Sequence, residues 1–146
     1  MTGMKRLIGL PVILNGKQIG AVERGVLQKD GKALSGLIVR EGLRSARWIQ
    51  AKNISLLGQL SVLCTSAPGK PPREAAFHLF RVTDANGLRI GRVTDALLDE
   101  QTLAVTALEI SAGPVDDLVY GRFFATSYDV KCYGETGHVT IPCKEN

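Results

Sequence analysis

The apolar residues of this chain alternate with polar ones over short runs, and turn-forming residues separate these runs. Residues 15–22 read N-G-x-x-I-G-x-V, and residues 86–93 repeat this pattern 71 positions later. Asn-Gly favours a type I′ hairpin turn, because both central residues of that turn need positive φ. The alternating Ile and Val that follow are typical of a half-buried strand. Each motif therefore predicts a tight turn and a strand, with a bulge or bend at the internal glycine.

The spacing of 71 positions continues beyond the two motifs, which predicts an internal duplication. The pairs at this spacing include Leu37 and Leu108, Val39 and Ile110, and Gly42 and Gly113. Further along, the spacing becomes 76, as in Ile54 and Val130. We expect a small insertion in the second copy, around residues 116–126, to account for this change.

Further alternating runs complete each copy as an all-β unit. In the first copy they are residues 34–40, Trp48-Ile49 and 61–64, and in the second 103–111, Val119-Tyr120 and 137–141. Turn signals stand between them, and convincing helical periodicity is missing. Five or six short strands per copy predict two small β-barrels or strongly curled sheets.

A proline-rich segment separates the two copies. Pro68, Pro71 and Pro72 exclude a helix or a central strand there. We expect a first domain over residues 1–66, a linker over 67–76 and a second domain over 77–146. Units of about 70 residues are small for independent stability, so we expect the halves to share an apolar interface.

The layout of each copy resembles the PRC-barrel family. This is a small β-barrel found in the cytoplasmic part of the H subunit of photosynthetic reaction centres and at the C-terminus of a ribosome-maturation factor. The resemblance lies in residues 7–12, 16–22, 36–39 and 54–58 of the first copy, and in 80–84, 87–95 and 107–110 of the second. It implies two tandem PRC-barrel-like domains that cover nearly the whole chain. The matched positions are glycines and apolar residues, which specify a shape and no chemistry.

The two halves differ strongly in charge. Residues 1–70 hold 11 Lys and Arg against 3 Asp and Glu, whereas residues 71–146 hold 7 against 11. Arg40, Arg44, Arg47 and Lys52 cluster around Trp48, the only tryptophan. This split has three interpretations: attraction between the halves or between subunits, an RNA surface with Trp48 as a stacking platform, and a protein-binding surface. Trp48 could equally belong to the core.

We therefore predict a non-enzymatic scaffold or adaptor that binds a protein partner through Arg40, Arg44, Arg47, Trp48 and Lys52. The alternative is an RNA- or ribosome-associated factor in RNA processing or ribosome maturation, which rests on analogy to the maturation factor. A homo-oligomer is left open.

The sequence predicts no catalytic residues, no metal site and no cofactor. His78 and His138 have no carboxylate or cysteine at the spacing of a metal site or catalytic triad. Cys64, Cys132 and Cys143 are an odd number without a C-x-x-C motif, although Cys132 and Cys143 could pair across adjacent strands. No apolar run approaches the ~18 residues of a membrane span. We expect a soluble, cytoplasmic protein of a bacterium or archaeon.

Overall fold

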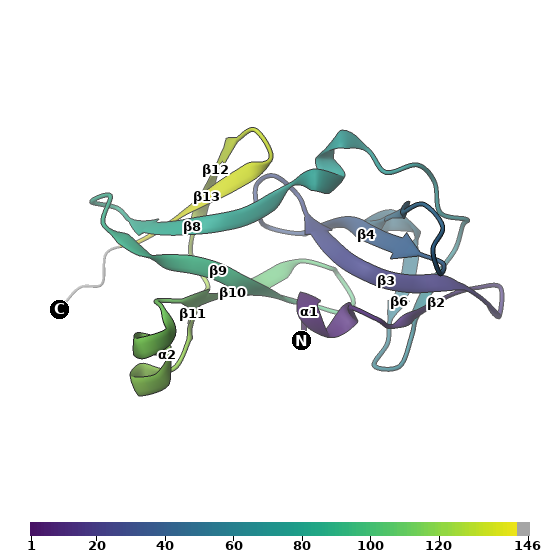
Figure 1. Cartoon of the computed structure of the whole chain (residues 1–146), viewed down its shortest axis with the longest axis horizontal. Helices are drawn as coiled ribbons and strands as arrows, with labels where there is room; N and C mark the ends of the chain where they lie inside the picture. The colour runs from purple at the N-terminus through teal and green to yellow at the C-terminus, as the bar shows by residue number, and fades with distance from the viewer. Residues whose placement is uncertain (143–146) are drawn as a thin grey trace.

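The computed structural model describes residues 1–142 and contains two β-sheets that lie side by side (Figure 1). The expected all-β class is confirmed at this level. The helical parts are two short α-helices, α1 (Met4–Leu7) and α2 (Pro114–Tyr120), and two 3-10 turns, η1 (Ala51–Asn53) and η2 (Arg73–Ala76).

The first sheet has the strand order β5-β4-β3-β2-β7-β6. Its strands are β2 (Pro11–Leu14), β3 (Lys17–Leu27), β4 (Leu34–Arg40), β5 (Arg47–Gln50), β6 (Ile54–Leu57) and β7 (Val62–Cys64). Strands β2 and β7 run parallel, and all other neighbours in this sheet are antiparallel.

The second sheet repeats this arrangement in the order β11-β10-β9-β8-β13-β12. Its strands are β8 (His78–Asp84), β9 (Arg89–Leu98), β10 (Val105–Ser111), β11 (Phe123–Ala125), β12 (Asp129–Tyr133) and β13 (Thr136–Ile141). Here β8 and β13 are the parallel pair, and the short strand β1 (Thr2–Gly3) also joins β9. Within residues 1–142 the two end strands of each sheet do not pair, so the expected closure into barrels is not seen in the strand pairing.

The register of the strands repeats as well as their order. Val22 pairs with Val39 in the first sheet, and Val93 pairs with Ile110 in the second. Both partners of the second pair lie 71 positions after those of the first. The register also skips one residue at the same place, between Val22 and Arg24 in β3 and between Val93 and Asp95 in β9. The sequence repeat therefore corresponds to a repeated structure.

The glycine inside the repeated strand is required by a close approach to the neighbouring strand. A Cβ on Gly91 would lie 2.1 Å from the carbonyl oxygen of Ser111. A Cβ on Gly20 would lie 3.0 Å from the carbonyl oxygen of Arg40, the residue equivalent to Ser111. The predicted bulge or bend is present, since the register between β2 and β3 and between β8 and β9 is shifted next to each glycine.

The turn prediction is correct for the first copy and wrong for the second. Asn15 and Gly16 both have positive φ, 50° and 79°, as a type I′ turn requires. In the second copy only Gly87 has positive φ, and the loop is one residue longer. The Asp84 carboxylate accepts hydrogen bonds from the N–H groups of Asn86 (2.9 Å) and Leu88 (3.0 Å). This side-chain contact stabilises a different turn.

The predicted insertion is confirmed, and it contains helix α2. After it, Phe124 pairs with Glu109 as Trp48 pairs with Ile38, so the spacing of 76 is already established at β11. The prediction that Val119-Tyr120 begins a strand is wrong, because both residues lie in α2. Pro114 in the first turn and two aspartates after it favour a helix start.

The two halves meet through equivalent residues. The Leu34 N–H donates to the Leu103 carbonyl (2.9 Å), and the Val105 N–H donates to the Lys32 carbonyl (2.8 Å). Residues 103 and 105 lie 71 positions after residues 32 and 34, so the contact has approximate two-fold symmetry. Buried Tyr128 adds a hydrogen bond to the Gly31 carbonyl (2.6 Å), and burial raises the pKa of its hydroxyl to about 12.

The segments that precede the first strand of each copy cross to the other copy. In α1, the Lys5 N–H donates to the Asp95 carboxylate of β9 (3.1 Å). The Arg24 guanidinium of β3 donates to the carbonyl of Ala75 in η2. Arg24 and Asp95 are equivalent positions, so each copy holds the leading segment of the other.

The linker covers the free edge of β5. The Trp48 N–H donates to the Gly69 carbonyl, and the Gly69 N–H donates to the Trp48 carbonyl, both at 2.8 Å. Gly69 therefore adds one isolated bridge to the edge of the first sheet, so the linker is more than a simple connection.

One apolar core spans both sheets and confirms the expected shared interface. It includes equivalent buried residues of both copies, among them Leu37 and Leu108, and Val39 and Ile110. A second cluster joins the copies at Trp48, where Val26 and Ile38 of the first sheet meet Ala75 and Phe77.

Candidate functional site

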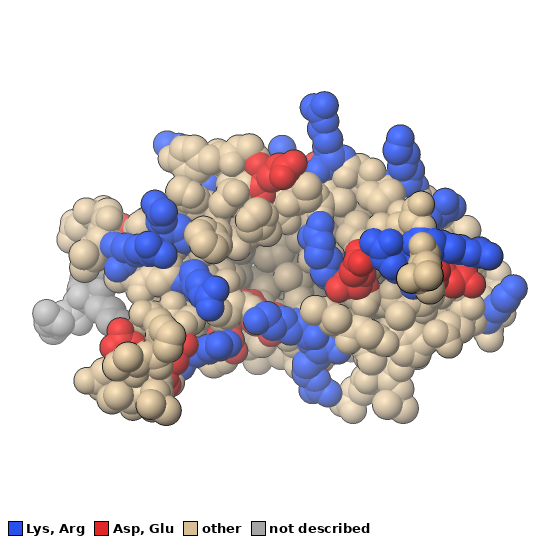
Figure 2. Space-filling model, in the orientation of Figure 1, with Lys and Arg blue, Asp and Glu red and all other residues tan. Residues whose placement is uncertain are grey.

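Three of the five predicted contact residues lie together beside the linker, and each has an acceptor. The Arg40 guanidinium contacts the Glu23 carboxylate at 2.9 Å, and that of Arg44 contacts the Glu41 carboxylate at 3.7 Å. Arg47 donates to the Pro68 carbonyl (3.3 Å). Basic and acidic atoms adjoin at the right of Figure 2, where this part of the molecule lies. The charges of Arg40 and Arg44 are therefore offset locally, whereas Arg47 meets only a neutral carbonyl. Exposed ion pairs of this kind contribute only ~0–1 kcal/mol to stability.

Trp48 and Lys52 do not belong to this surface. Trp48 is only 6% exposed and packs in the cluster with Phe77, so its proposed role as a stacking platform is wrong. An indole that is 6% exposed presents almost no ring surface on which a base could stack. Lys52 is exposed on η1 and lines a hollow together with Trp48, Pro72 and Glu74, which none of the three arginines lines. The structure thus divides the predicted site.

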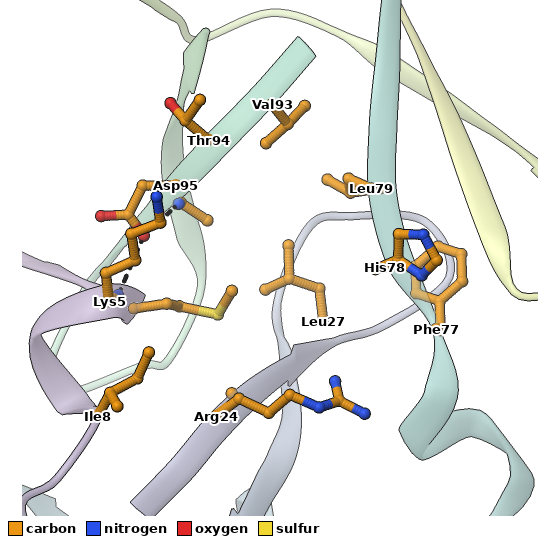
Figure 3. Close-up of a pocket in the computed structure, with 13 residues that line it drawn as sticks. Lys5, Ile8, Arg24, Leu27, Phe77, His78, Leu79, Val93, Thr94 and Asp95 are labelled. Carbon is orange, nitrogen blue, oxygen red and sulfur yellow. Dashed lines mark hydrogen bonds between the residues drawn. The ribbon is translucent and has the colours of Figure 1, made fainter. Parts of the chain in front are cut away.

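A pocket of about 240 Å³ opens between the two sheets (Figure 3). Leu27 from the first sheet and Leu79 and Val93 from the second form much of its apolar lining, with Phe77 beside them. Polar side chains border it, namely Lys5, Arg24, His78 and Asp95. Arg24 and Asp95, which are equivalent residues of the two copies, both line the pocket. The pocket therefore lies near the approximate two-fold axis.

Two of these polar side chains, Arg24 and Asp95, already serve the contact between the copies. Asp95 accepts hydrogen bonds from the Lys5 N–H and from the Ala96 N–H (2.8 Å), and Arg24 binds the Ala75 carbonyl. The volume is also below the ~300 Å³ at which ligand pockets usually begin. The pocket therefore has the size for a small apolar molecule, and two of its bordering polar side chains, Arg24 and Asp95, are committed to the fold.

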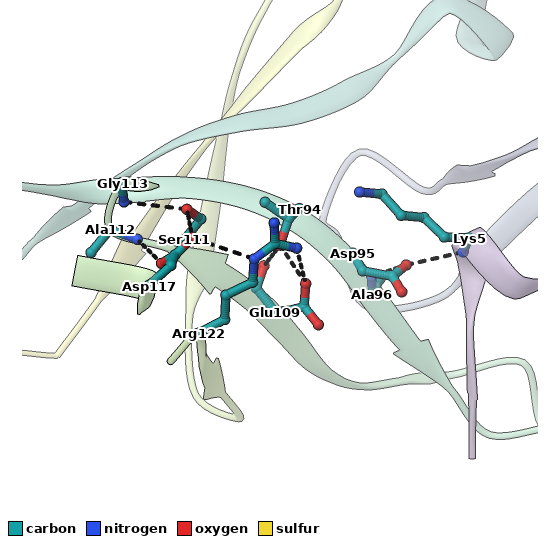
Figure 4. Close-up of polar contacts among 10 residues, drawn as sticks. All are labelled: Lys5, Thr94, Asp95, Ala96, Glu109, Ser111, Ala112, Gly113, Asp117 and Arg122. Carbon is teal, nitrogen blue, oxygen red and sulfur yellow. Dashed lines mark hydrogen bonds and ion pairs between the residues drawn. The ribbon is translucent and has the colours of Figure 1, made fainter. Parts of the chain in front are cut away.

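A polar cluster attaches helix α2 to the second sheet (Figure 4). The Ser111 hydroxyl donates to the Asp117 carboxylate (2.5 Å), and the Ala112 N–H donates to the same carboxylate (3.2 Å). The Arg122 guanidinium contacts Asp117 (3.4 Å) and also Glu109 (2.9 Å). Asp117 is thus the residue through which the helix is held.

The charged members of the cluster stabilise one another. The hydrogen bond from Ser111, followed by those from Ala112 and Arg122, lowers the pKa of Asp117 below its ordinary value of 3.8. The hydrogen bond from Thr94 and then Arg122 lower the pKa of Glu109, and the pairing with Glu109 raises that of Arg122. All three groups are held in their charged forms, so the cluster is suited to structural attachment rather than to proton transfer at neutral pH.

The attachment of α2 should therefore weaken in acid. A carboxylate whose pKa is lowered in the folded state contributes stability above its unfolded pKa and loses it as the pH falls through the folded value. We expect the Leu118 and Val119 amides to lose hydrogen-exchange protection, corrected for the intrinsic rate, as the pH falls below 3.8 through the lowered pKa of Asp117. In Asp117→Asn the same amides should be poorly protected at every pH. A ¹³C titration that places the Asp117 pKa at its ordinary value would contradict this account.

Helix α2 turns its apolar side chains to the solvent. Leu118 is 87% exposed, Tyr120 84%, Val115 74% and Val119 64%. Phe124 of the adjacent strand β11 is 54% exposed. Figure 1 shows the helix projecting from the end of the second sheet. We call these five side chains the apolar knob.

Sequence reasoning missed the apolar knob, although a signal for it exists. Gly113-Pro114 followed by Asp116-Asp117 is a helix-start pattern, and Val115, Leu118 and Val119 stand at helical spacing. The match to Trp48-Ile49 instead predicts the start of a strand at Val119-Tyr120.

The two histidines and the two described cysteines lie outside any constellation of catalytic or metal-binding groups among residues 1–142. The Tyr133 and His138 rings lie 4.6 Å apart between centroids, and His78 is exposed at the start of β8. Buried Cys64 contacts the Ile13 carbonyl through its thiol (3.6 Å), and burial raises the pKa of that thiol. Cys132 contacts the Lys29 carbonyl (3.3 Å), while the suggested pairing with Cys143 lies outside the described residues.

Two further kinds of feature are absent from residues 1–142. In that part of the chain no group of three or more His, Cys, Asp and Glu is placed to hold a metal ion. Over the same residues, no helix has the length and apolar character needed to cross a membrane.

Comparison with known proteins assigns no family to this chain. No family model and no curated protein matches this chain.

Proposed function

We propose that this chain is a non-enzymatic adaptor that binds another protein through the apolar knob. The observation that carries the proposal is the orientation of α2. Its carboxylate at Asp117 faces the sheet, while Val115, Leu118, Val119 and Tyr120 face the solvent. A helix on a sheet ordinarily places its apolar side inward. The reversed arrangement leaves apolar surface for a partner to cover.

Comparison of the two copies supports this proposal. In the first copy a short loop connects β4 to β5, and that loop carries the charged residues Glu41 and Arg44. The second copy carries the longer α2 segment at the same place, held by the Ser111–Asp117–Arg122 cluster. The helix is therefore additional to what the repeated sheet requires, and its polar contacts fix it in one orientation.

The resemblance to PRC-barrel domains remains part of this proposal, as does the cytoplasmic location. The repeated strand order and register support a tandem pair of related domains. The arginine cluster is a secondary surface here, because Arg40, Arg44 and Arg47 each have an acceptor. RNA is the second candidate partner, favoured by the 11 basic against 3 acidic residues in positions 1–70.

The test is a quantitative pull-down with the full chain from a lysate of the source organism. We expect the double variant Leu118→Glu, Val119→Glu to retain its specific protein partners about tenfold less than the unmodified chain, since two charges would enter the apolar contact. Leu43→Glu is the matched control, because Leu43 is a fully exposed leucine in the equivalent loop of the first copy.

Two outcomes would reject the adaptor proposal in this form. One is equal retention of the same proteins by the double variant and the unmodified chain. The other is a set of partners that ribonuclease removes and that is lost when Arg40, Arg44, Arg47 and Lys52 are changed to glutamate. The second outcome would favour the RNA candidate.

A further inference from the structure

We infer that the outer edge of β11 binds an extended segment of a partner protein by strand addition, with the new pairing at the outward-facing N–H and carbonyl of Phe124. This inference rests on the proposed function, because it specifies the form in which the adaptor would hold its partner.

The first copy contains the model for this contact. Trp48 in edge strand β5 pairs with Ile38 of β4, and its N–H and carbonyl face the other way, where they bind Gly69 of the linker. The linker thus already pairs with the edge of the first sheet, through the single residue Gly69.

The second copy has the equivalent edge, and among residues 1–142 no bridge like that of Gly69 is formed to Phe124. Phe124 of β11 pairs with Glu109 of β10, and these residues are the equivalents of Trp48 and Ile38. Because the register is the same, the N–H and carbonyl of Phe124 face away from β10. Within residues 1–142 neither group has a hydrogen-bond partner. The edge therefore offers one donor and one acceptor at the spacing that the linker uses in the first copy.

The route of the linker also predicts what an added segment would meet. Beside β5, linker residues Ala67 and Pro68 share a hollow with Glu41 and Arg44 of the β4–β5 loop. In the second copy α2 replaces that loop. A segment added to β11 along the equivalent path would therefore pass the apolar side chains of α2, and it would bury part of the apolar knob.

The side chains around the edge indicate which segment fits. Among the described residues, nothing lies within 4 Å of a Cβ placed on Gly69, so the position opposite the edge residue accepts a side chain. Opposite Phe124, which is half exposed, an apolar side chain would cover the ring. Exposed Asp116 and the excess of acidic residues in positions 71–146 favour a basic residue nearby. We therefore specify an extended segment with an apolar residue opposite Phe124 and a lysine or arginine close to it.

The experiment uses short peptides displayed as a random library and selected on the full chain. Selected peptides are synthesised, and their affinities are measured by fluorescence anisotropy for the unmodified chain, Phe124→Pro and Phe124→Ala. Proline removes the N–H and is tolerated on an edge strand. We expect Phe124→Pro to weaken binding about tenfold or more. Phe124→Ala, which keeps the N–H, should weaken it less. Peptide binding should also protect the Phe124 amide of the unmodified chain from hydrogen exchange.

Several results would overturn the inference. They are a library that yields no binder, binders with equal affinity for Phe124→Pro, and a Phe124 amide whose exchange is unchanged by bound peptide. The exchange measurement decides the matter alone if circular dichroism shows that Phe124→Pro does not fold. A dimer in sedimentation velocity that Phe124→Pro dissociates would make a second copy the occupant instead.

The same variant separates this inference from the proposed function. Partners in the lysate that depend on Leu118 and Val119, but are retained by folded Phe124→Pro, would leave the adaptor proposal standing and remove strand addition.

Discussion

Replacing Trp48 with alanine should lower the free energy of unfolding by about 3–5 kcal/mol, which makes it one of the two most damaging changes considered for this chain. The indole is 6% exposed and fills the cluster that joins the first sheet to Ala75 and Phe77. Its removal would leave a cavity and would loosen the contact between the copies.

The duplication supplies a matched control for this change. Phe124 occupies the equivalent strand position but is 54% exposed, so Phe124→Ala should cost less than about 1 kcal/mol. Both variants are compared by urea unfolding followed by far-UV circular dichroism, because Trp48 is the only tryptophan and its fluorescence disappears with it. Equal stability losses in the two variants would show that the two edges are not packed as described.

Gly91→Ala is the second change with a large expected effect, a loss of about 3 kcal/mol or more. The new Cβ would lie 2.1 Å from the Ser111 carbonyl oxygen and 2.9 Å from its carbon. These are backbone atoms of the adjacent strand, so β9 and β10 would have to separate. The same measurement of urea unfolding checks this result.

Gly69→Ala is the control for the glycine substitution itself. Within the described part of the chain nothing lies within 4 Å of its Cβ, and its φ is not positive. It should change stability by less than about 1 kcal/mol. If Gly91→Ala were as well tolerated as Gly69→Ala, the close approach of β9 to β10 would be wrong.

Much of the fold follows from local patterns in the sequence. The alternation in residues 15–22 and 86–93, together with the spacing of 71, predicts equivalent strands, and β3 and β9 have matching registers. The turn at Asn86 was not predictable from its Asn-Gly pair alone, because the Asp84 carboxylate binds two backbone N–H groups there. Such a side-chain contact competes with the turn that the pair itself prefers.

The candidate site was harder to predict for two physical reasons. Trp48 was ambiguous, since its exposure depends on whether the distant Ala75 and Phe77 cover it. The acceptors of Arg40 and Arg47 come from Glu23 and Pro68, which pairing and the linker route bring close. Helix α2 was missed because an expected strand was placed on residues whose own pattern favours a helix.

The exchange of leading segments between the copies couples the unfolding of the two sheets. Residues 4–7 bind the second sheet at Asp95, and residues 73–76 bind the first sheet at Arg24. Neither half completes its own packing from its own stretch of chain. The two sheets therefore belong to one cooperative unit that gains and loses its structure together, and a cut in the proline-rich segment would yield fragments that must reassociate rather than two autonomous modules.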